Sequence, residues 1–160
     1  MKKIILVLIV LLNMFSFQLL AQKQNQPVQL KSLLQQYSKE YYALNPLEAT
    51  QAGINDYNNQ MEITISEDYT KKAKALNQKY LTQLDVINKA GVTASELLSI
   101  DVLTYKLKSE NERLNNSLGF YRPVDQFVFS FPTKFATLGS GAGFIPFNTE
   151  KDYRDFISRM

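Results

Sequence analysis

The most informative chemical feature of these 160 residues is that they contain no histidine and no cysteine. Imidazole and thiolate groups are common general bases, nucleophiles and ligands for zinc or copper. Carboxylates alone could still bind Mg²⁺ or Ca²⁺, but the acids are scattered and no segment has the spaced Asp and Asn ligands of a calcium-binding loop. The sequence therefore predicts no catalytic, cofactor-binding or metal-binding residue in this chain.

A glycine-rich run at residues 139–143, GSGAG, is a second pattern that could serve chemistry. A dinucleotide-binding fingerprint requires G-x-G-x-x-G between a strand and a helix, and a P-loop requires G-x-x-x-x-G-K-[ST]. The run has neither spacing, and residues 144–146 (FIP) follow it where a helix should begin. We therefore expect a folded loop, with a loop that lines or closes over a ligand cleft as the alternative.

The segment from Phe120 to Phe147 holds seven of the ten phenylalanines and could offer aromatic surfaces to a ligand. Single-stranded nucleic acids stack on such surfaces, but the grooves that hold them are basic. Only one cation, Lys134, lies near the closely spaced rings, which are Phe127, Phe129, Phe131 and Phe135. We expect these rings to pack within the domain or against helices from elsewhere in the protein.

Asp101 is the one acidic residue whose position looks interior, because it shares a predicted helical face with Leu97 and Tyr105. The simpler interpretation is a half-exposed carboxylate that is hydrogen-bonded to a neighbour. The alternative is a buried carboxylate that pairs with an Arg or Lys of another element or borders a cleft.

The first 21 residues have the organisation of a secretory signal peptide. Lys2 and Lys3 precede an apolar stretch, and Ala21 supplies the small residue after which we expect cleavage. A retained membrane helix is the alternative, since residues 4–21 approach the roughly 20 residues that span a bilayer. Polar residues interrupt this stretch, however, and no basic flank follows it. We expect export to the periplasm or the extracellular space, with membrane contact only through this segment during export.

Removal of residues 1–21 would take away two lysines and no acid, leaving 16 basic and 15 acidic residues. Such a balanced chain has no basic surface that could follow the phosphates of a nucleic acid, so we expect no nucleic-acid partner. Without cysteine the exported domain must be stabilised by its core rather than by disulfides.

Apolar residues recur at helical spacing along most of the remaining chain, which predicts an all-α fold. After a polar leader at residues 22–29, one apolar stripe covers residues 30–44. Asn45-Pro46 is expected to end that helix and to begin a short one, with Asn45 as its cap. Residues 55–60 (NDYNNQ) predict a loop.

Two longer helices are predicted next. Ser66 is the expected cap of the first, and Gly91 marks its expected end. Thr93 and Glu96 form a capping box for the second, which continues to Asn115. Because two or three residues would join these helices, we expect an antiparallel helical hairpin.

From Gly119 onward prolines interrupt any long helix, so we predict an irregular Phe- and Gly-rich connector with a short extended piece at residues 126–131. Thr149 is the expected cap of a last helix, whose apolar face reaches Met160 without a stop signal. We therefore expect residues 30–160 to be the amino-terminal helical part of a larger α-helical domain, truncated at its carboxyl end.

Three stretches carry a resemblance to known proteins: YYALNPLEATQAGINDYNNQ at residues 41–60, SELLSIDVLTYKL at residues 95–107, and DQFVFSFPTKFATLGSGAGFIPFNTEKDYRDFISRM at residues 125–160. Together they resemble the amino-terminal part of the DUF885 family of exported bacterial proteins. The first stretch is similar to the opening motif of that family through Leu44, Pro46, Ala49, Thr50 and Gly53. It departs from the motif at Ile54, where an acid often follows the glycine.

The resemblance implies a mostly α-helical protein similar to zinc-dependent metallopeptidases of the HExxH type. In such enzymes two histidines one helical turn apart hold zinc, and the intervening glutamate activates a water molecule. That motif lies far downstream of the stretches matched here, so no residue of this chain inherits a ligand or catalytic role. Zinc is expected only in a full-length relative, and the implied role of this chain is a scaffold around a cleft.

Two hypotheses follow from the sequence. In the first, the chain is the amino-terminal scaffold of an exported DUF885-type peptidase or hydrolase, whose partners are the missing carboxyl-terminal region and a peptide substrate. In the second, it is a small complete secreted helical binding or envelope protein that has no enzymatic activity and uses its Phe-rich segment on a partner.

Overall fold

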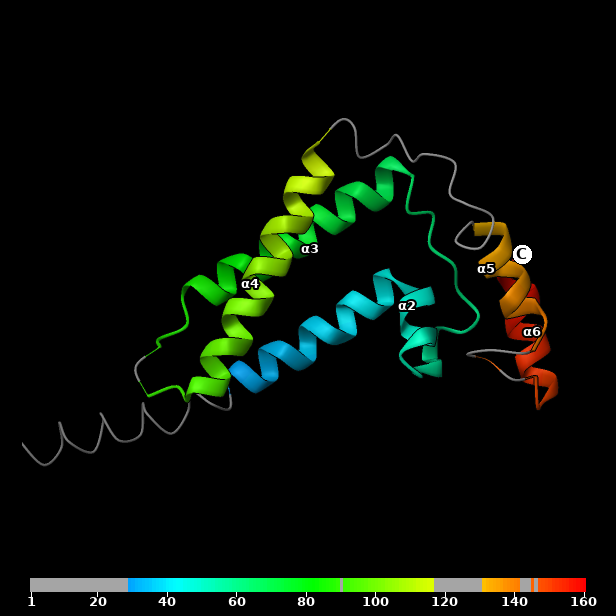
Figure 1. Cartoon of the computed structure of the whole chain (residues 1–160), viewed down its shortest axis with the longest axis horizontal. Helices are drawn as coiled ribbons and strands as arrows, with labels where there is room; N and C mark the ends of the chain where they lie inside the picture. Colours follow the sequence, from blue (N-terminus) through cyan, green and yellow to red (C-terminus); the bar gives the residue numbers. More distant parts are fainter. Residues whose placement is uncertain (1–28, 90, 117–130, 142–144, 146) are drawn as a thin grey trace, which may run out of the picture.

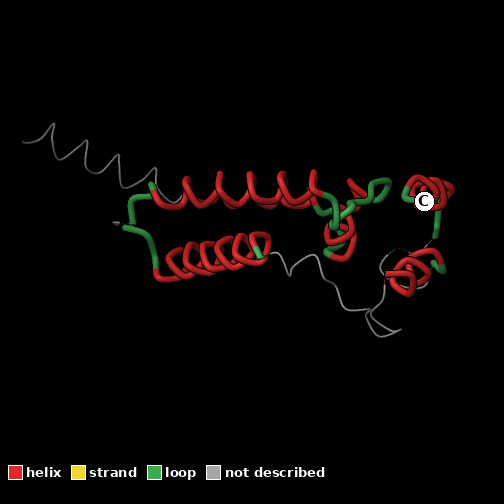
Figure 2. Tube along the Cα trace, turned by 90° about the horizontal axis from the view of Figure 1, so that it is seen from above, coloured by secondary structure: helices red, strands yellow, loops and turns green. Residues whose placement is uncertain are grey.

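The computed structural model describes residues 29–89, 91–116, 131–141, 145 and 147–160, and the regular structure in these residues is helical (Figures 1 and 2). The predicted all-α class is therefore confirmed. The elements are a helix at residues 29–44, α2 (Pro46–Gln51), the 3₁₀ turn η1 (Asn55–Tyr57), α3 (Glu67–Asp85), α4 (Ala94–Asn115), α5 (Phe131–Gly139) and α6 (Glu150–Ser158).

Several sequence-based expectations fall on residues outside these ranges. They are the signal peptide at residues 1–21, most of the polar leader at residues 22–29, most of the extended piece at residues 126–131 with Phe127 and Phe129, and the later part of the glycine run at residues 142–143. Of the helices that the structure describes, none has the length and hydropathy needed to cross a bilayer.

The helix at residues 29–44 ends at Asn45, and Pro46 begins α2, as the sequence predicts. The prediction that the Asn45 side chain caps α2 is wrong. Its Nδ2 instead donates to the Tyr41 carbonyl at 2.8 Å, and its Oδ1 accepts from the Tyr69 hydroxyl at 2.6 Å. The Leu47 amide, one of the amides left free at a helix start, donates to the Glu62 carboxylate at 3.1 Å. Glu62, which lies 15 positions after Leu47 in the chain, therefore accepts the amide hydrogen bond that the local cap was expected to accept.

Helices α3 and α4 form the predicted antiparallel hairpin, visible in Figure 1. Ser66 accepts the Tyr69 amide at the start of α3, and Thr93 and Glu96 form the predicted capping box of α4. The predicted end of α3 is wrong. The Leu84 carbonyl accepts the Ile87 amide in a tighter turn, so α3 ends at Asp85 and residues 86–93 join the hairpin. Gly91, with φ of +92°, lies in this connection.

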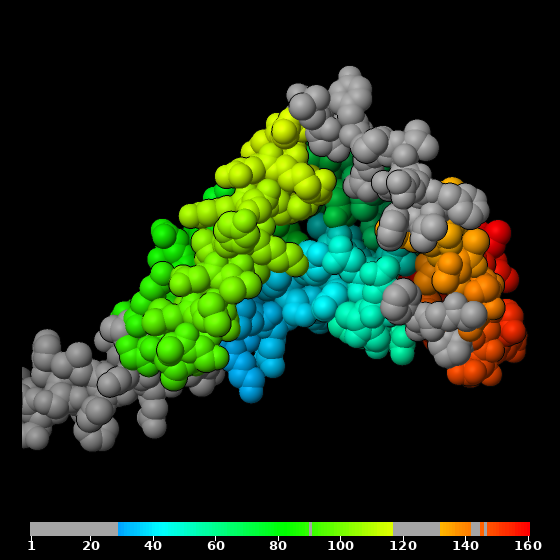
Figure 3. All heavy atoms as spheres, viewed as in Figure 1, coloured from blue at the N-terminus to red at the C-terminus, as the bar shows by residue number. Residues whose placement is uncertain are grey.

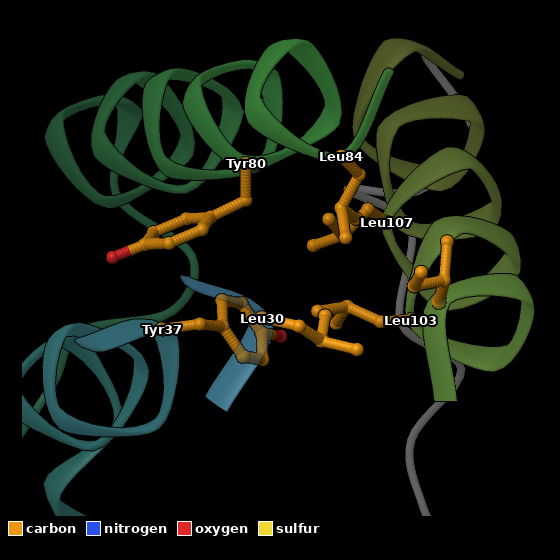
Figure 4. Close-up of a cluster of buried hydrophobic side chains, with 7 residues drawn as sticks. Leu30, Tyr37, Tyr80, Leu84, Leu103 and Leu107 are labelled. Carbon is orange, nitrogen blue, oxygen red and sulfur yellow. The ribbon is translucent and has the colours of Figure 1, made fainter. Parts of the chain in front are cut away.

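The core forms where the helix at residues 29–44 lies against the hairpin (Figure 4). The rings of Tyr37 and Tyr80 meet edge to face with centroids 5.1 Å apart. Every member of this core lies at helical spacing within one of the three helices that the sequence predicted, as expected for the buried faces of packed helices. The buried members are Leu30, Tyr37, Tyr80, Leu84, Ile100, Leu103 and Leu107.

Helices α5 and α6 correct the prediction of an irregular connector, because residues 131–139 form α5. Pro132 lies in the first turn, where an amide hydrogen is not needed, so it does not break this helix. Phe135 packs on Phe156 of α6 with ring centroids 5.2 Å apart. A Cβ on Gly139 would lie 2.6 Å from the Phe156 ring, so any side chain there would displace this ring. Of the four closely spaced rings, Phe135 has a described side chain, and it packs within the domain as expected.

Leu107 and Leu98 lie on opposite faces of α4 and give a matched test of this core. Leu107 is 1% exposed and Leu98 is 63% exposed. We expect Leu107→Ala to lower the free energy of unfolding by about 2–5 kcal/mol, because it leaves a cavity between the three helices. Leu98→Ala should change it by less than about 1 kcal/mol. Urea denaturation followed by circular dichroism measures both; equal losses would show that the helices do not pack in this way.

Candidate functional site

Two features that the sequence singled out do not form a site. The Asp101 side chain is 70% exposed and lies 4.0 Å from the Lys89 ammonium, so it is more exposed than the half-exposed, hydrogen-bonded carboxylate that the sequence predicted, and the alternative of a buried carboxylate is wrong. In the glycine run, Gly139 is the last residue of α5 and lies against the Phe156 ring. Gly141 has a φ of +67°, and its Cα lies beside the Phe147 ring. Both glycines therefore contact aromatic side chains of the same domain.

A cleft of about 350 Å³ lies where the carboxyl-terminal end of the helix at residues 29–44 diverges from the α3–α4 hairpin. Figure 3 shows the surface hollowed between the yellow-green part of α4 and the cyan segment that includes α2. The first helix, α2, the loop before α3, α3 and α4 all contribute to its walls. Its volume lies at the lower end of the roughly 300–1,000 Å³ typical of small-molecule sites.

Tyrosine hydroxyls and amides form much of the cleft wall. The Tyr41 hydroxyl donates to Glu48 Oε2 at 2.5 Å, and the Tyr69 hydroxyl donates to Asn45 Oδ1 at 2.6 Å. Burial, followed by the hydrogen bond to Glu48, raises the pKa of Tyr41, and burial raises that of Tyr69. These phenols therefore keep their protons and act as hydrogen-bond donors.

Charged groups of both signs line the same cleft. Arg113 pairs with Glu110 through two hydrogen bonds, from Nε at 2.9 Å and from Nη2 at 2.5 Å. The Lys106 ammonium lies 4.0 Å from the centre of the Tyr41 ring, in the position of a cation–π contact. Glu48 and Glu62 complete the charged lining.

Glu62 is a half-buried carboxylate on the loop before α3. Burial raises its pKa above the ordinary value of 4.5, and the hydrogen bond from the Leu47 amide works in the opposite direction. Glu48 raises this pKa further, whereas Arg159 lowers it. The carboxylate thus carries a desolvation cost that a nearby positive charge would relieve.

Arg159, which follows α6, fixes the segment that carries part of this cleft. Its guanidinium is buried at 6% exposure among residues 50–60, about 100 positions earlier in the chain. Nε donates to the Gln60 carbonyl at 2.9 Å, and Nη2 donates to the Tyr57 carbonyl at 3.1 Å and to Thr50 Oγ1 at 2.6 Å. Thr50 Oγ1 itself lies 2.8 Å from Asn58 Oδ1. Helix α6 is therefore tied to α2 and η1 by one buried cation.

Sequence reasoning identified neither Arg159 nor the cleft. A single arginine after an expected surface helix gives no periodic signal, and the cleft groups come from five separate segments. One partial signal was present: Thr50 belongs to the opening motif that carries the family resemblance. In the part of the chain that the structure describes, no group of three or more acidic, His or Cys side chains could hold a metal ion.

These observations define an all-α protein with a polar, ligand-sized cleft that contains binding groups and no metal centre among the described residues. The chain belongs to the DUF885 family, whose model, described as a bacterial protein of unknown function, matches residues 46–160. The expected family assignment is thereby confirmed. No curated protein and no solved structure matches this chain.

Arg159 and Arg154 give a matched comparison, because both interact from the α6 segment but only Arg159 is buried. We expect Arg159→Ala to lower the free energy of unfolding by about 2–4 kcal/mol, since it leaves buried carbonyl groups without their donor. Arg154→Ala removes an exposed pair with Glu150 and should cost less than about 1 kcal/mol. Urea denaturation measures both, and a cost for Arg159→Ala no larger than for Arg154→Ala would contradict the assigned contacts.

Glu62 and Glu96 should titrate on opposite sides of the ordinary value of 4.5. Burial raises the pKa of Glu62, so its contribution to stability is complete below pH 4.5 and is lost as the pH rises through its folded pKa. Hydrogen bonds from Thr93 lower the pKa of Glu96, so its contribution is present above pH 4.5 and is lost on acidification. Carboxyl ¹³C NMR titration measures both values; Glu62 titrating at or below Glu96 would refute the buried placement.

Proposed function

We propose that this chain is the amino-terminal scaffold portion of an exported, zinc-dependent DUF885-type peptidase, with the metal and the reacting groups supplied by the carboxyl-terminal region of the protein. Its own contribution is one wall of a substrate cleft. In this proposal residues 1–21 direct the protein to the periplasm or the extracellular space.

One observation carries the proposal: a ligand-sized cleft lies between the helix at residues 29–44 and the family-matched region, yet its groups are suited to binding rather than to zinc-dependent catalysis. Its phenols keep their protons because burial raises their pKa values, and Arg113 is already paired with Glu110. The 160 residues contain no histidine or cysteine that could hold zinc. Zinc-dependent hydrolysis of the HExxH type would therefore need groups from another part of the protein.

Exposed apolar side chains also support a scaffold role. Leu98, Val102 and Tyr105 lie one helical turn apart along one face of α4, with exposures of 63%, 60% and 75%. Ile157 and Met160 are 65% and 83% exposed near the end of α6. In a larger domain such faces would be covered by further helices.

The proposal predicts that the purified chain binds no stoichiometric zinc and hydrolyses no peptide, with or without added zinc. Metal analysis after dialysis and a fluorogenic peptide assay test this. The reading frame beyond codon 160 should encode an HExxH motif. One equivalent of tightly bound zinc would contradict the assignment of the metal site to another region. An in-frame stop in an intact gene, with no such motif in any downstream frame, would overturn the proposal in favour of a complete secreted binding protein.

A further inference from the structure

The guanidinium of Arg159 occupies a small buried site on the α2–η1 segment, formed by Thr50, Tyr57 and Gln60, which we call the socket. Nη2 donates to Thr50 Oγ1 at 2.6 Å and to the Tyr57 carbonyl at 3.1 Å, and Nε donates to the Gln60 carbonyl at 2.9 Å. Nε and Nη2 form one edge of the planar guanidinium group, whereas a lysine ammonium is a point donor. The three acceptors therefore fit a guanidinium better than any other side-chain cation.

Hydrogen bonds within the segment hold the acceptors of the socket in place. Thr50 and Asn58 are buried, with exposures of 1% and 5%. The Thr50 hydroxyl donates to Asn58 Oδ1 at 2.8 Å, which leaves its oxygen free to accept from Arg159. Asn58 Nδ2 donates to Asn55 Oδ1 at 3.1 Å and so fixes the orientation of the amide. None of these bonds involves Arg159, so the acceptor positions are set by the socket itself.

The charge of Arg159 points to recognition between two segments. Among the described residues Arg159 forms no ion pair, and its Nη1 has no hydrogen-bond partner. Burial lowers the pKa of Arg159, and the charges of Glu62 and Asp155 work in the opposite direction. A buried cation without an ionic partner is costly, and an apolar contact between the two segments would avoid that cost.

Helix α6 reaches the α2–η1 segment through this one side chain. No residue of α6 itself is buried, and its Phe156 ring packs on Phe135 of α5. In the part of the chain that the structure describes, the hydrogen bonds from the α6 segment to residues 50–60 come from Arg159. Ser158 and Met160 on either side of it are exposed, so the arginine side chain enters the socket from the surface. Truncation of that side chain would open the same path to solvent.

We propose that the socket is a binding site for a monosubstituted guanidinium group, which the Arg159 side chain fills in the intact chain and which a separate guanidinium compound fills when that side chain is removed. Helix α6 is then docked by recognition of one cation, as a bound peptide would be, rather than by apolar burial. The inference goes beyond the proposed function and does not rest on it.

Thermal melting of the full-length Arg159→Ala variant with ethylguanidinium tests the inference, because this probe replaces the atoms that the substitution removes. We expect a saturable rise in melting temperature of about 3–8 °C at about ten times the dissociation constant of the probe. n-Butylammonium has the same charge without the planar edge and should raise it by less than about 1 °C. The unsubstituted chain, whose socket is filled, and Arg154→Ala should respond to neither cation. No rise, an equal rise with both cations, or an equal rise in the control chains would overturn the inference.

Arg159→Lys tests the same selectivity without an added ligand, and it applies even if Arg159→Ala does not fold. The lysine keeps the charge and most of the stem, but its ammonium cannot meet all three acceptors in the geometry of the guanidinium edge. We expect the variant to melt several degrees below the unsubstituted chain. A lysine variant that melts with the unsubstituted chain would show that the socket accepts any cation and would contradict the proposal.

Thr50 and Thr82 give a matched test of the acceptors. Each hydroxyl donates to the carbonyl four residues earlier in its helix, at 3.1 and 3.0 Å, but Thr50 also accepts from Arg159. In the Arg159→Ala background, Thr50→Val should weaken ethylguanidinium binding about tenfold, as expected for one hydrogen bond to a charged group. Thr82→Val should leave the affinity unchanged.

Isothermal titration measures both affinities, and circular dichroism confirms that each variant is folded. Equal affinities in the two threonine variants would remove Thr50 from the site and contradict the proposal. These measurements involve neither zinc nor a peptide, so their failure would leave the scaffold proposal intact.

Discussion

The contact between Tyr37 and Tyr80 is the interaction on which the rest of the structure depends. It joins the helix at residues 29–44 to the α3–α4 hairpin, with Leu84 and Leu107 packed in the same core. Tyr37 is also one of the residues that line the cleft. Core and cleft are neighbours in one arrangement. Apolar stripes hold the three helices together, and polar residues that include Asn45, Glu48 and Glu110 line the cleft beside them. A change in this packing would therefore alter the cleft.

Long-range polar contacts fix the open end of the bundle. Glu62 accepts the Leu47 amide at the start of α2, and the Tyr69 hydroxyl donates to Asn45. Arg159 binds Thr50 and the carbonyls of Tyr57 and Gln60 from a position far along the chain. Such contacts are costly to break because the groups are buried, so they hold the short α2–η1 segment in one position against the longer helices. The family-matched range, residues 46–160, contains nearly all of these residues.

The sequence predicted those parts of the fold that local chemistry determines. Helical spacing identified the buried stripes, and the caps at Ser66, Thr93 and Thr149 are present because each side chain accepts an amide three residues ahead. Predictions failed where tertiary contacts override local preference. The Asn45 side chain accepts a hydrogen bond from the Tyr69 hydroxyl instead of capping α2. Residues 131–139 fold as a helix that packs on α6. The cleft joins groups from five segments, so no spacing along the chain could have indicated it.

The central proposal is that these helices form a scaffold that performs no metal chemistry of its own. Metal analysis of the purified chain after incubation with zinc and dialysis, together with a fluorogenic peptide assay of the same sample, measures this directly. The account predicts no stoichiometric zinc and no peptide hydrolysis. One equivalent of tightly bound zinc, or peptide hydrolysis that depends on added zinc, would contradict it.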